Sequence, residues 1–446
     1  MNRRQFLGTG AALSATSLFS PRSLFAESAI RANQDRFPKR LEPTSTLGGV
    51  KEFHIWIDII QHEIVPGVTV HMLAFNDQVP GPEIRVTEGD QVRVVFENRT
   101  QLNHTIHWHG LHVPWRHDGV PFVTQLPTMP NMEFVYEFEA KPYGTHIYHC
   151  HWGTLLHMQV GMYGSIIIEA KGEDPIHKQF PYDREYTLVY SSHDTNWIRR
   201  EMNHMLERMK ERTYLMQSGR FERERFGVFA DVEDFERAVE QGYIPPYVTN
   251  VRSAAELPHP NFFTVNGKSY PMTPRLYIRE GENIRVRLIN AGGDAHSLHL
   301  HGYDFWLVAD DGIPLAAPYQ MNTLLLAPGK THDIIIEGKN RGIWTFHDHD
   351  TRRVTNNGIY PGGTLMALVY EDLPEEERLV DSPLSGLRMQ GMDDMEGMDD
   401  MEGMEHAGMD HEGMDKKPEG QMEKGGMKMH MDLDGLTKLP FISLDQ

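Results

Sequence analysis

The chain has 446 residues, which is long enough for two or three domains with buried cores. Its formal net charge of −20 argues against a nucleic acid as a partner, because phosphate binding requires basic patches. The single cysteine excludes an intramolecular disulfide framework, and no apolar run approaches the roughly 20 residues that a membrane-spanning helix requires.

The N-terminus has the pattern of an export signal. Arg3-Arg4-Gln5-Phe6-Leu7 is a twin-arginine motif, and a short apolar stretch and a candidate cleavage site after Ala26 follow it. The alternative is a chance pair of arginines, but this leaves the Phe-Leu pair and the apolar stretch unexplained. We therefore expect residues 1–26 to be a twin-arginine signal peptide, and the mature protein to be periplasmic or otherwise exported. Residues 27–45 are expected to form a loose lead-in.

Residues 46–172 have the pattern of a β-sandwich domain. Short runs rich in Val, Ile, Phe and Tyr, such as Val92–Phe96, alternate with Gly, Asn and Pro turns. The segment 84–110 ends in HTIHWHG, a motif with three closely spaced histidines that occurs again later in the chain.

The only cysteine lies between two histidines, in His149-Cys150-His151, and His157 and Met162 follow it. A thiolate, an imidazole and a thioether along one strand–loop–strand unit are the ligand set of a blue-copper electron-transfer centre. Neighbours in a strand point to opposite sides, so the flanking histidines are predicted to connect this centre to a second copper site. A lone cysteine is usually only a small buried hydrophobe, but that alternative leaves the surrounding histidines unexplained.

A second domain is expected over residues 173–372, interrupted at about 196–243 by a polar insertion with helical character. Its segment 276–302 repeats residues 84–110 without a gap, at an offset of 192. The later motif HDH at 347–349 likewise matches HCH at 149–151. The chain therefore contains an internal duplication of a whole domain. The matched histidine pairs are His104 and His296, His107 and His299, His109 and His301, His149 and His347, and His151 and His349.

Residues 373–446 differ in kind from the rest of the chain. Twelve of the 25 methionines fall between Met389 and Met431, in a low-complexity segment rich in Asp, Glu and Gly. Such a segment is expected to be disordered on its own. It could be only a solubilising acidic tail, but the methionines favour copper capture, because thioethers are soft ligands suited to Cu(I).

These motifs resemble the multicopper oxidases, and among them the two-domain laccase-like members. HWHG, HCH followed by His and Met, HxxHxHG and HxH occur in the family's order over roughly residues 50–170 and 255–372. The resemblance implies an all-β fold of two cupredoxin-like Greek-key β-sandwich domains. It also implies about four coppers per chain, one blue copper and a trinuclear cluster between domains.

The resemblance assigns each candidate ligand to a copper type. The type 1 ligands are His104, Cys150, His157 and Met162. The type 2 ligands are His107 and His299. The type 3 ligands are His109, His149, His151, His301, His347 and His349. Asp118 resembles the family's acidic residue that assists proton delivery, although it could be only an Asp-Gly turn residue. Asp348 replaces the thiolate in the second domain, so His296 is expected to be a relic or a hydrogen-bonding residue.

The predicted function is one-electron oxidation of a small reducing substrate coupled to reduction of O2 to water. Phenols, aromatic amines and Cu(I) remain open as donors, and Cu(I) oxidation would give a role in copper tolerance. The resemblance also suggests a homotrimer. Two alternatives are a copper-containing nitrite reductase, which would leave most of the histidines without a role, and a non-enzymatic periplasmic copper-binding protein.

Overall fold

The computed structural model describes residues 33–220 and 257–371, together with the single residues 233, 237, 240, 241 and 373. The predicted signal peptide, most of the second part of the predicted insertion and all of the predicted disordered tail except Leu373 lie outside these described residues. Within the described ranges, no helix is both long and apolar enough to cross a membrane.

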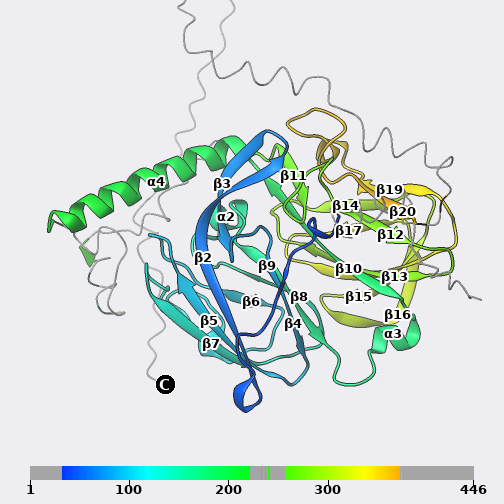
Figure 1. Cartoon of the computed structure of the whole chain (residues 1–446), viewed down its shortest axis with the longest axis horizontal. Helices are drawn as coiled ribbons and strands as arrows, with labels where there is room; N and C mark the ends of the chain where they lie inside the picture. Colours follow the sequence, from blue (N-terminus) through cyan, green and yellow to red (C-terminus); the bar gives the residue numbers. More distant parts are fainter. Residues whose placement is uncertain are drawn as a thin grey trace, which may run out of the picture. The chain divides into compact units, whose positions relative to one another are not determined.

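The first half of the described chain forms a β-sandwich, which we call the first sandwich. Its two sheets have the strand orders β1-β4-β9-β8-β6 and β3-β2-β5-β7. The strands are β1 (Arg40–Leu41), β2 (Val50–Val65), β3 (Val68–Phe75), β4 (Gly81–Thr87), β5 (Gln91–Asn98), β6 (His107–His109), β7 (Glu133–Glu139), β8 (Gly144–His149) and β9 (Tyr163–Glu169). The short helices are η1 (Leu47–Gly49), η2 (Trp115–His117) and α2 (Thr154–Gln159). Figure 1 shows these strands in blue to green.

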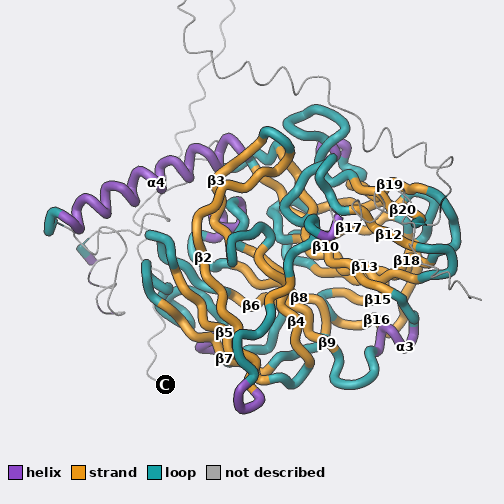
Figure 2. The backbone as a smooth tube through the Cα atoms, viewed as in Figure 1, coloured by secondary structure: helices purple, strands orange, loops and turns teal. Residues whose placement is uncertain are grey.

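The second half forms the second sandwich, with strand orders β11-β10-β13-β18-β15-β16 and β12-β20-β19-β14-β17. Its strands are β10 (Arg184–His193), β11 (Phe262–Val265), β12 (Arg275–Ile278), β13 (Asn283–Asn290), β14 (His296–Leu300), β15 (Phe305–Asp310), β16 (Ile313–Met321), β17 (Thr323–Leu326), β18 (Thr331–Glu337), β19 (Ile343–Asp348) and β20 (Met366–Tyr370). Its helices are α3 (Pro175–Gln179), α4 (Thr195–Gln217) and η6 (Thr351–Val354). The described chain is therefore mostly strand, as Figure 2 shows, and the predicted all-β fold is confirmed.

Alternating side chains build the cores of both sandwiches. In β5, Val92, Val94 and Phe96 are buried at every second position, which is the period of a strand with one face on the core. Strand β8 departs from this rule, because all six of its residues are buried. The second sandwich covers its outer face: the Thr145 hydroxyl donates to Asp333 at 2.8 Å, and Thr331 donates to the Thr145 carbonyl at 2.9 Å.

The lead-in is not loose where the structure describes it. The side chain of Asn33 exchanges two hydrogen bonds with the main chain of Arg275, at 3.0 and 2.8 Å, and β1 pairs in parallel with β4. The segment therefore connects the second sandwich to an edge of the first. Sequence periodicity could not show this, because a two-residue strand has no detectable alternation.

The predicted insertion begins with a long helix, as expected. Asp194 caps α4, accepting hydrogen bonds from the amides of Asn196 and Trp197 at 3.1 and 2.9 Å. Helix α4 contacts β3 and α2 (Figure 1). On this helix Met202 and Met205 are buried, whereas His204 is exposed. Met205 therefore has a packing position and His204 a surface position.

Candidate metal centres

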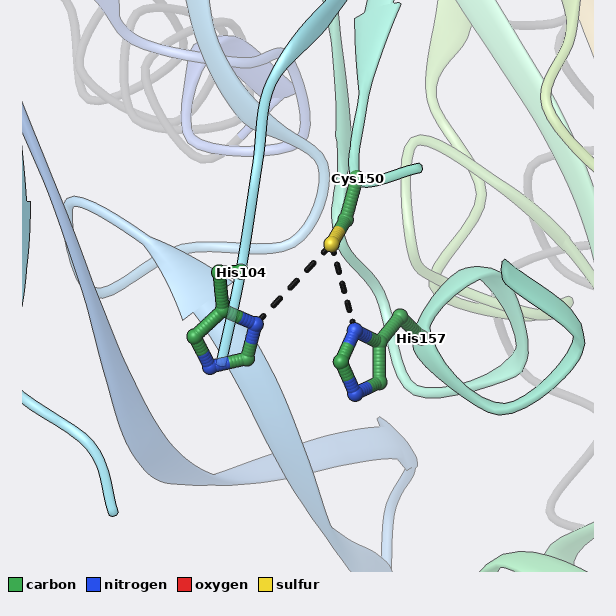
Figure 3. A group of neighbouring side chains, drawn as sticks. All are labelled: His104, Cys150 and His157. Carbon is green, nitrogen blue, oxygen red and sulfur yellow. Dashed lines mark hydrogen bonds between the residues drawn. The ribbon is translucent and has the colours of Figure 1, made fainter. Parts of the chain in front are cut away.

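Three buried side chains converge at one end of the first sandwich. The sulfur of Cys150 lies 3.1 Å from Nδ1 of His157 and 3.9 Å from Nδ1 of His104, as Figure 3 shows. All three residues are buried, and their potential ligand atoms lie within 4.8 Å of one another. One thiolate and two imidazole nitrogens directed at one point fit the equatorial ligands of a blue-copper site.

Local structure brings these three residues together from separate elements. Cys150 directly follows β8, and His104 is held by a bridge to Thr128, whose carbonyl accepts from the His104 amide at 3.1 Å. His157 lies on the short helix α2, which begins after Gly153. The expected strand–loop–strand unit is thus a strand–helix–strand unit, because the seven residues from Cys150 to His157 leave room for one helical turn.

Met162, the fourth predicted type 1 ligand, is fully buried beside the same group. Its carbonyl accepts from the amide of Cys150 at 3.1 Å, and its amide donates to the carbonyl of His157 at 3.0 Å. The main chain of Met162 is therefore bonded to two of the three converging residues, as a shared site requires.

Burial sets the protonation of this group. It lowers the pKa of His157 to about 3, and it lowers the pKa of His104 well below its usual value, with the His157 ring as a smaller cause. Burial raises the pKa of the Cys150 thiol to about 12. The two imidazoles are therefore neutral and able to bind a metal at neutral pH, whereas the thiolate form requires a bound cation.

Sequence reasoning missed Thr100 as part of this site. Its hydroxyl lies 2.8 Å from Nε2 of His104, which leaves Nδ1 of that ring facing the sulfur. The repeat contains a clue to this role. At the offset of 192, Thr100 corresponds to Gly292, so the second sandwich has no equivalent hydroxyl to bond His296.

A second group, the first half-set, comprises His107, His109, His149 and His151. Residues His107 and His149 are directly paired across β6 and β8. Ring centroids lie 5.3 Å apart for this pair, 5.5 Å for His107 and His151, and 5.7 Å for His109 and His149. The rings of His149 and His151 stack with their centroids 6.1 Å apart. Cys150 thus joins the two groups through one peptide segment.

Asp118 lies beside the first half-set. Nδ1 of His107 lies 2.7 Å from the Asp118 carbonyl oxygen and 3.4 Å from its carboxylate oxygen. A Cβ on the next residue, Gly119, would overlap the Ile106 carbonyl, so glycine lets this turn approach β6 closely. The carboxylate is partly exposed and therefore connects the His107 ring with solvent.

The second sandwich contains the equivalent second half-set, His299, His301, His347 and His349. His299 and His347 are directly paired across β14 and β19, and Nε2 of His301 lies 2.9 Å from Nε2 of His347. Nδ1 of His299 lies 2.8 Å from the Asn322 carbonyl, and Nδ1 of His347 lies 2.8 Å from the Asp348 carbonyl. The rings of His299 and His347 donate through Nδ1 to these carbonyl oxygens, so each leaves Nε2 as a potential metal ligand.

Comparisons with known proteins agree with this geometry. Two multicopper oxidase family models match residues 58–173 and 243–360, more than half of the chain. The chain belongs to the multicopper oxidase family. It is 30% identical over 279 residues to copper resistance protein A of Escherichia coli, covering 61% of this chain and 44% of that protein. It is 28% identical over 339 residues to laccase-2 of Botryotinia fuckeliana, covering 75% and 49%. This multicopper oxidase therefore spans about half the length of the curated relatives it matches.

Solved structures of the family share the fold. The blue copper oxidase of Nitrosomonas europaea has a TM-score of 0.58 and 33% identity, covering 73% of this chain and 88% of that one. The multicopper oxidase mgLAC has a TM-score of 0.58 and 32% identity, covering 72% and 87%. A copper nitrite reductase from Nitrosomonas europaea has a TM-score of 0.51 at 20% identity, which shows a shared fold alone.

Within this multicopper oxidase, the two half-sets remain separate. Among the described residues, histidine ring contacts occur inside each half-set, and none joins one half-set to the other. His301 and His349 are exposed, whereas His149 is buried. The four histidines of each half-set are those that the sequence places in its repeated motifs.

The second sandwich has a buried His–Asp pair where the first has its sulfur. Nδ1 of His296 lies 2.8 Å from a carboxylate oxygen of Asp348, and both side chains are fully buried. Burial alone would raise the pKa of Asp348, but its hydrogen bonds, with the one from His296 foremost, lower it below the usual value. The expected hydrogen-bonding role of His296 agrees with this geometry.

Proposed function

We propose that this multicopper oxidase takes electrons one at a time from a small reducing substrate and uses them to reduce dioxygen to water. One observation carries the proposal. Cys150 contacts His104 and His157 with its side chain, while its two chain neighbours, His149 and His151, belong to the first half-set. An electron-accepting centre and an oxygen-reducing centre would thus be joined by a few covalent bonds.

The proposed ligands are those that the sequence predicts, and the donor chemistry fits copper. His104, Cys150, His157 and Met162 would hold the type 1 copper. His107 and His299 would hold the type 2 copper. His109, His149, His151, His301, His347 and His349 would hold the type 3 pair, giving about four coppers per chain. When bound, the type 1 copper supplies one-electron chemistry and the other three supply the four-electron reduction of O2.

Asp118 is proposed to supply protons. Its carboxylate lies 3.4 Å from Nδ1 of His107 and is partly exposed, so it can exchange a proton with solvent and pass it towards the first half-set. Its carbonyl meanwhile accepts from the same ring at 2.7 Å and holds that ring in one orientation.

The electron donor is proposed to be a phenol, an aromatic amine or Cu(I). Relatives named laccase and copper resistance protein A favour this range and a role in copper tolerance. The methionine-rich tail, which lies outside the described residues, is proposed to capture Cu(I). Export to the periplasm by the twin-arginine signal would place the enzyme where it meets external copper.

A head-to-tail homotrimer is proposed to complete the three-copper cluster. Each chain offers one half-set of four histidines on each sandwich, and the more exposed second half-set is available to a neighbouring chain. Pairing the first half-set of one chain with the second half-set of the next would close a ring, since a heterologous interface can form closed rings.

Copper analysis combined with oxygen uptake tests the proposal. The purified full-length protein should contain about four coppers per chain and consume O2 with a phenolic donor or Cu(I). About two coppers with nitrite reduction would instead show a nitrite reductase. Bound copper without either activity would show a non-enzymatic copper-binding protein. Size-exclusion chromatography with light scattering tests the trimer.

A further inference from the structure

One buried carboxylate in the second sandwich accepts three hydrogen bonds. Asp348 accepts from Nδ1 of His296 at 2.8 Å, and from the amides of Ser297 and Asp350 at 3.1 and 2.9 Å. The guanidinium of Arg353 lies 3.8 Å away and is the nearby cation. The carboxylate is fully buried, so these partners replace the water that it lost on folding.

These donors belong to the two chain segments that carry the second half-set. Ser297 lies on β14, two residues before His299, and Asp350 directly follows His349. The amide of His349 also donates to the Ser297 carbonyl at 2.7 Å. Fixing Ser297 and Asp350 to one carboxylate therefore fixes the main chain on both sides of the potential ligands.

The internal repeat shows what the carboxylate replaces. Cys150 and Asp348 hold equivalent positions, and Nδ1 of the equivalent histidine faces each of them, His104 in one sandwich and His296 in the other. In the second sandwich no hydroxyl serves the other nitrogen, and Nε2 of His296 has no hydrogen-bond partner among the described residues. Among the described residues, the His296 ring therefore has Asp348 as its hydrogen-bond partner.

Arg353 is the cation nearest to the buried carboxylate of Asp348 among the described ion pairs. Its side chain is 12% exposed and lies 3.2 Å from Asp350 and 3.7 Å from Asp294, besides Asp348. The guanidinium thus lies near three carboxylates and balances part of the negative charge around Asp348.

We propose that Asp348 is the positioning residue of the second half-set. Supported by His296 and Arg353, it holds His299, His347 and His349 in place without a metal, as the copper-bound Cys150 would do for the first half-set. This inference rests on the proposed copper function, because positioning is useful only if the second half-set binds copper.

The test compares Asp348→Asn with Asp333→Asn. Asp333 is the matched control, since it is also a buried, arginine-paired aspartate of the second sandwich, but it bonds Arg285 and Thr145 rather than the segments that carry the second half-set. The first measurement is ¹⁵N NMR of histidine side chains in the copper-free protein, which reports the tautomer of His347. The second is copper affinity of the full-length protein, measured against a competing chelator.

In the parent protein we expect His347 to be a single tautomer with its proton on Nδ1. Asp348→Asn should give a mixture of tautomers and weaken copper binding in the cluster by about 10- to 100-fold, the usual effect of removing a group that orients metal ligands. The blue absorption of the type 1 site should stay unchanged. Asp333→Asn should lower thermal stability but keep the parent tautomer and copper affinity.

The proposal is overturned if Asp348→Asn keeps the parent tautomer and affinity, or if Asp333→Asn changes both equally. If Asp348→Asn does not fold, Arg353→Gln decides in the same way: mixed tautomers support the proposal, and an unchanged His347 overturns it. A parent protein that binds no cluster copper would contradict the proposed function, while the copper-free NMR comparison would still test the positioning role.

Discussion

At the scale of single residues, burial and hydrogen bonding decide what each candidate ligand can do. His157 and His104 are neutral because they are buried, and the Thr100 hydroxyl selects which nitrogen of His104 faces the sulfur. Cys150 is a buried thiol whose pKa is raised to about 12, so it becomes a thiolate only with a cation present. Metal binding at this group is therefore coupled to release of the thiol proton.

Replacing Cys150 by serine tests whether this residue connects the group formed with His104 and His157 to the first half-set. We expect Cys150→Ser to abolish the intense blue absorption and turnover, because a hard hydroxyl cannot replace a thiolate, while the cluster coppers stay bound. Absorption spectra, copper analysis and oxygen uptake measure these three effects. A Cys150→Ser protein that oxidises phenols at the parent rate would refute the type 1 assignment.

Thr100→Val tests how His104 is oriented. The substitution keeps the shape of the side chain but removes the hydroxyl 2.8 Å from Nε2 of His104. Leaving that buried nitrogen without a partner should cost about 1–3 kcal/mol of unfolding free energy and shift the type 1 absorption band. Denaturant unfolding and absorption spectra provide the measurements. Thr69→Val, on an exposed position of β3, is the control and should change neither.

At the scale of elements, the short helix α2 is what brings His157 to the sulfur. Gly153 precedes it with φ 54° and ψ 42°, a left-handed conformation that favours glycine. Its carbonyl accepts from the amides of Leu156 and His157, both at 3.0 Å. The position of His157 therefore depends on a turn that only a few residue types can form.

Gly153→Ala should lower the free energy of unfolding by about 1–2 kcal/mol, the cost of the left-handed conformation for an L-residue. It should also weaken the blue absorption, since His157 moves with the turn. Gly172→Ala is the control, because that glycine also has a positive φ, 111°, but lies after β9 with open space around it. If both variants lose stability and only Gly153→Ala loses blue colour, the turn is responsible. Equal blue absorption in Gly153→Ala and Gly172→Ala would show that the turn at Gly153 does not position His157.

At the scale of the whole molecule, two buried histidines connect the sandwiches. Nε2 of His62 lies 2.6 Å from the Gly267 carbonyl, and Nδ1 of His193 lies 2.8 Å from the Gln159 carbonyl. Burial, the largest cause, lowers the pKa of each to about 4. Both are neutral in the folded protein, whereas in the unfolded chain each binds a proton near pH 6.5.

Stability should therefore fall as the pH is lowered. Between pH 6.5 and 4 the unfolded state binds more protons than the folded state, so each histidine removes up to about 3 kcal/mol of unfolding free energy over this range. Thermal unfolding of the copper-free parent and of the double variant His62→Gln/His193→Gln, measured from pH 7.5 to 4, gives the test. The thermal stability of the double variant should fall less than that of the parent as the pH is lowered. If stability fell equally with pH in both proteins, His62 and His193 would not be the cause of the pH dependence.

The proposed capture of Cu(I) by the methionine-rich tail is also tested at this scale. Removing the residues after Pro383 should leave the blue colour and phenol oxidation nearly intact, but lower Cu(I) binding capacity and slow Cu(I) oxidation at low copper, because the proposed capture by thioethers would raise the local concentration of Cu(I). Titration against a Cu(I) chelator and oxygen uptake at limiting Cu(I) are the measurements. Equal values in both forms would leave the tail as a solvated acidic extension.

The sequence by itself determined the residues of both sandwiches' half-sets and the group around Cys150. It could do so because strand alternation and the duplication are local patterns, so HWHG and HCH place their histidines on one side of paired strands wherever the sandwich forms. The all-β fold follows from the same short apolar runs separated by turns.

Only the tertiary structure decided how distant segments meet. It showed that the lead-in bonds the second sandwich through Asn33, that α2 carries His157, and that Asp348 binds two segments about 50 residues apart in the chain. These contacts join residues far apart in sequence, and no local periodicity encodes them. The sequence alone suggests that Asp348 is only a lost ligand. Its hydrogen bonds from His296 and Ser297 form only because β14 and β19 are paired.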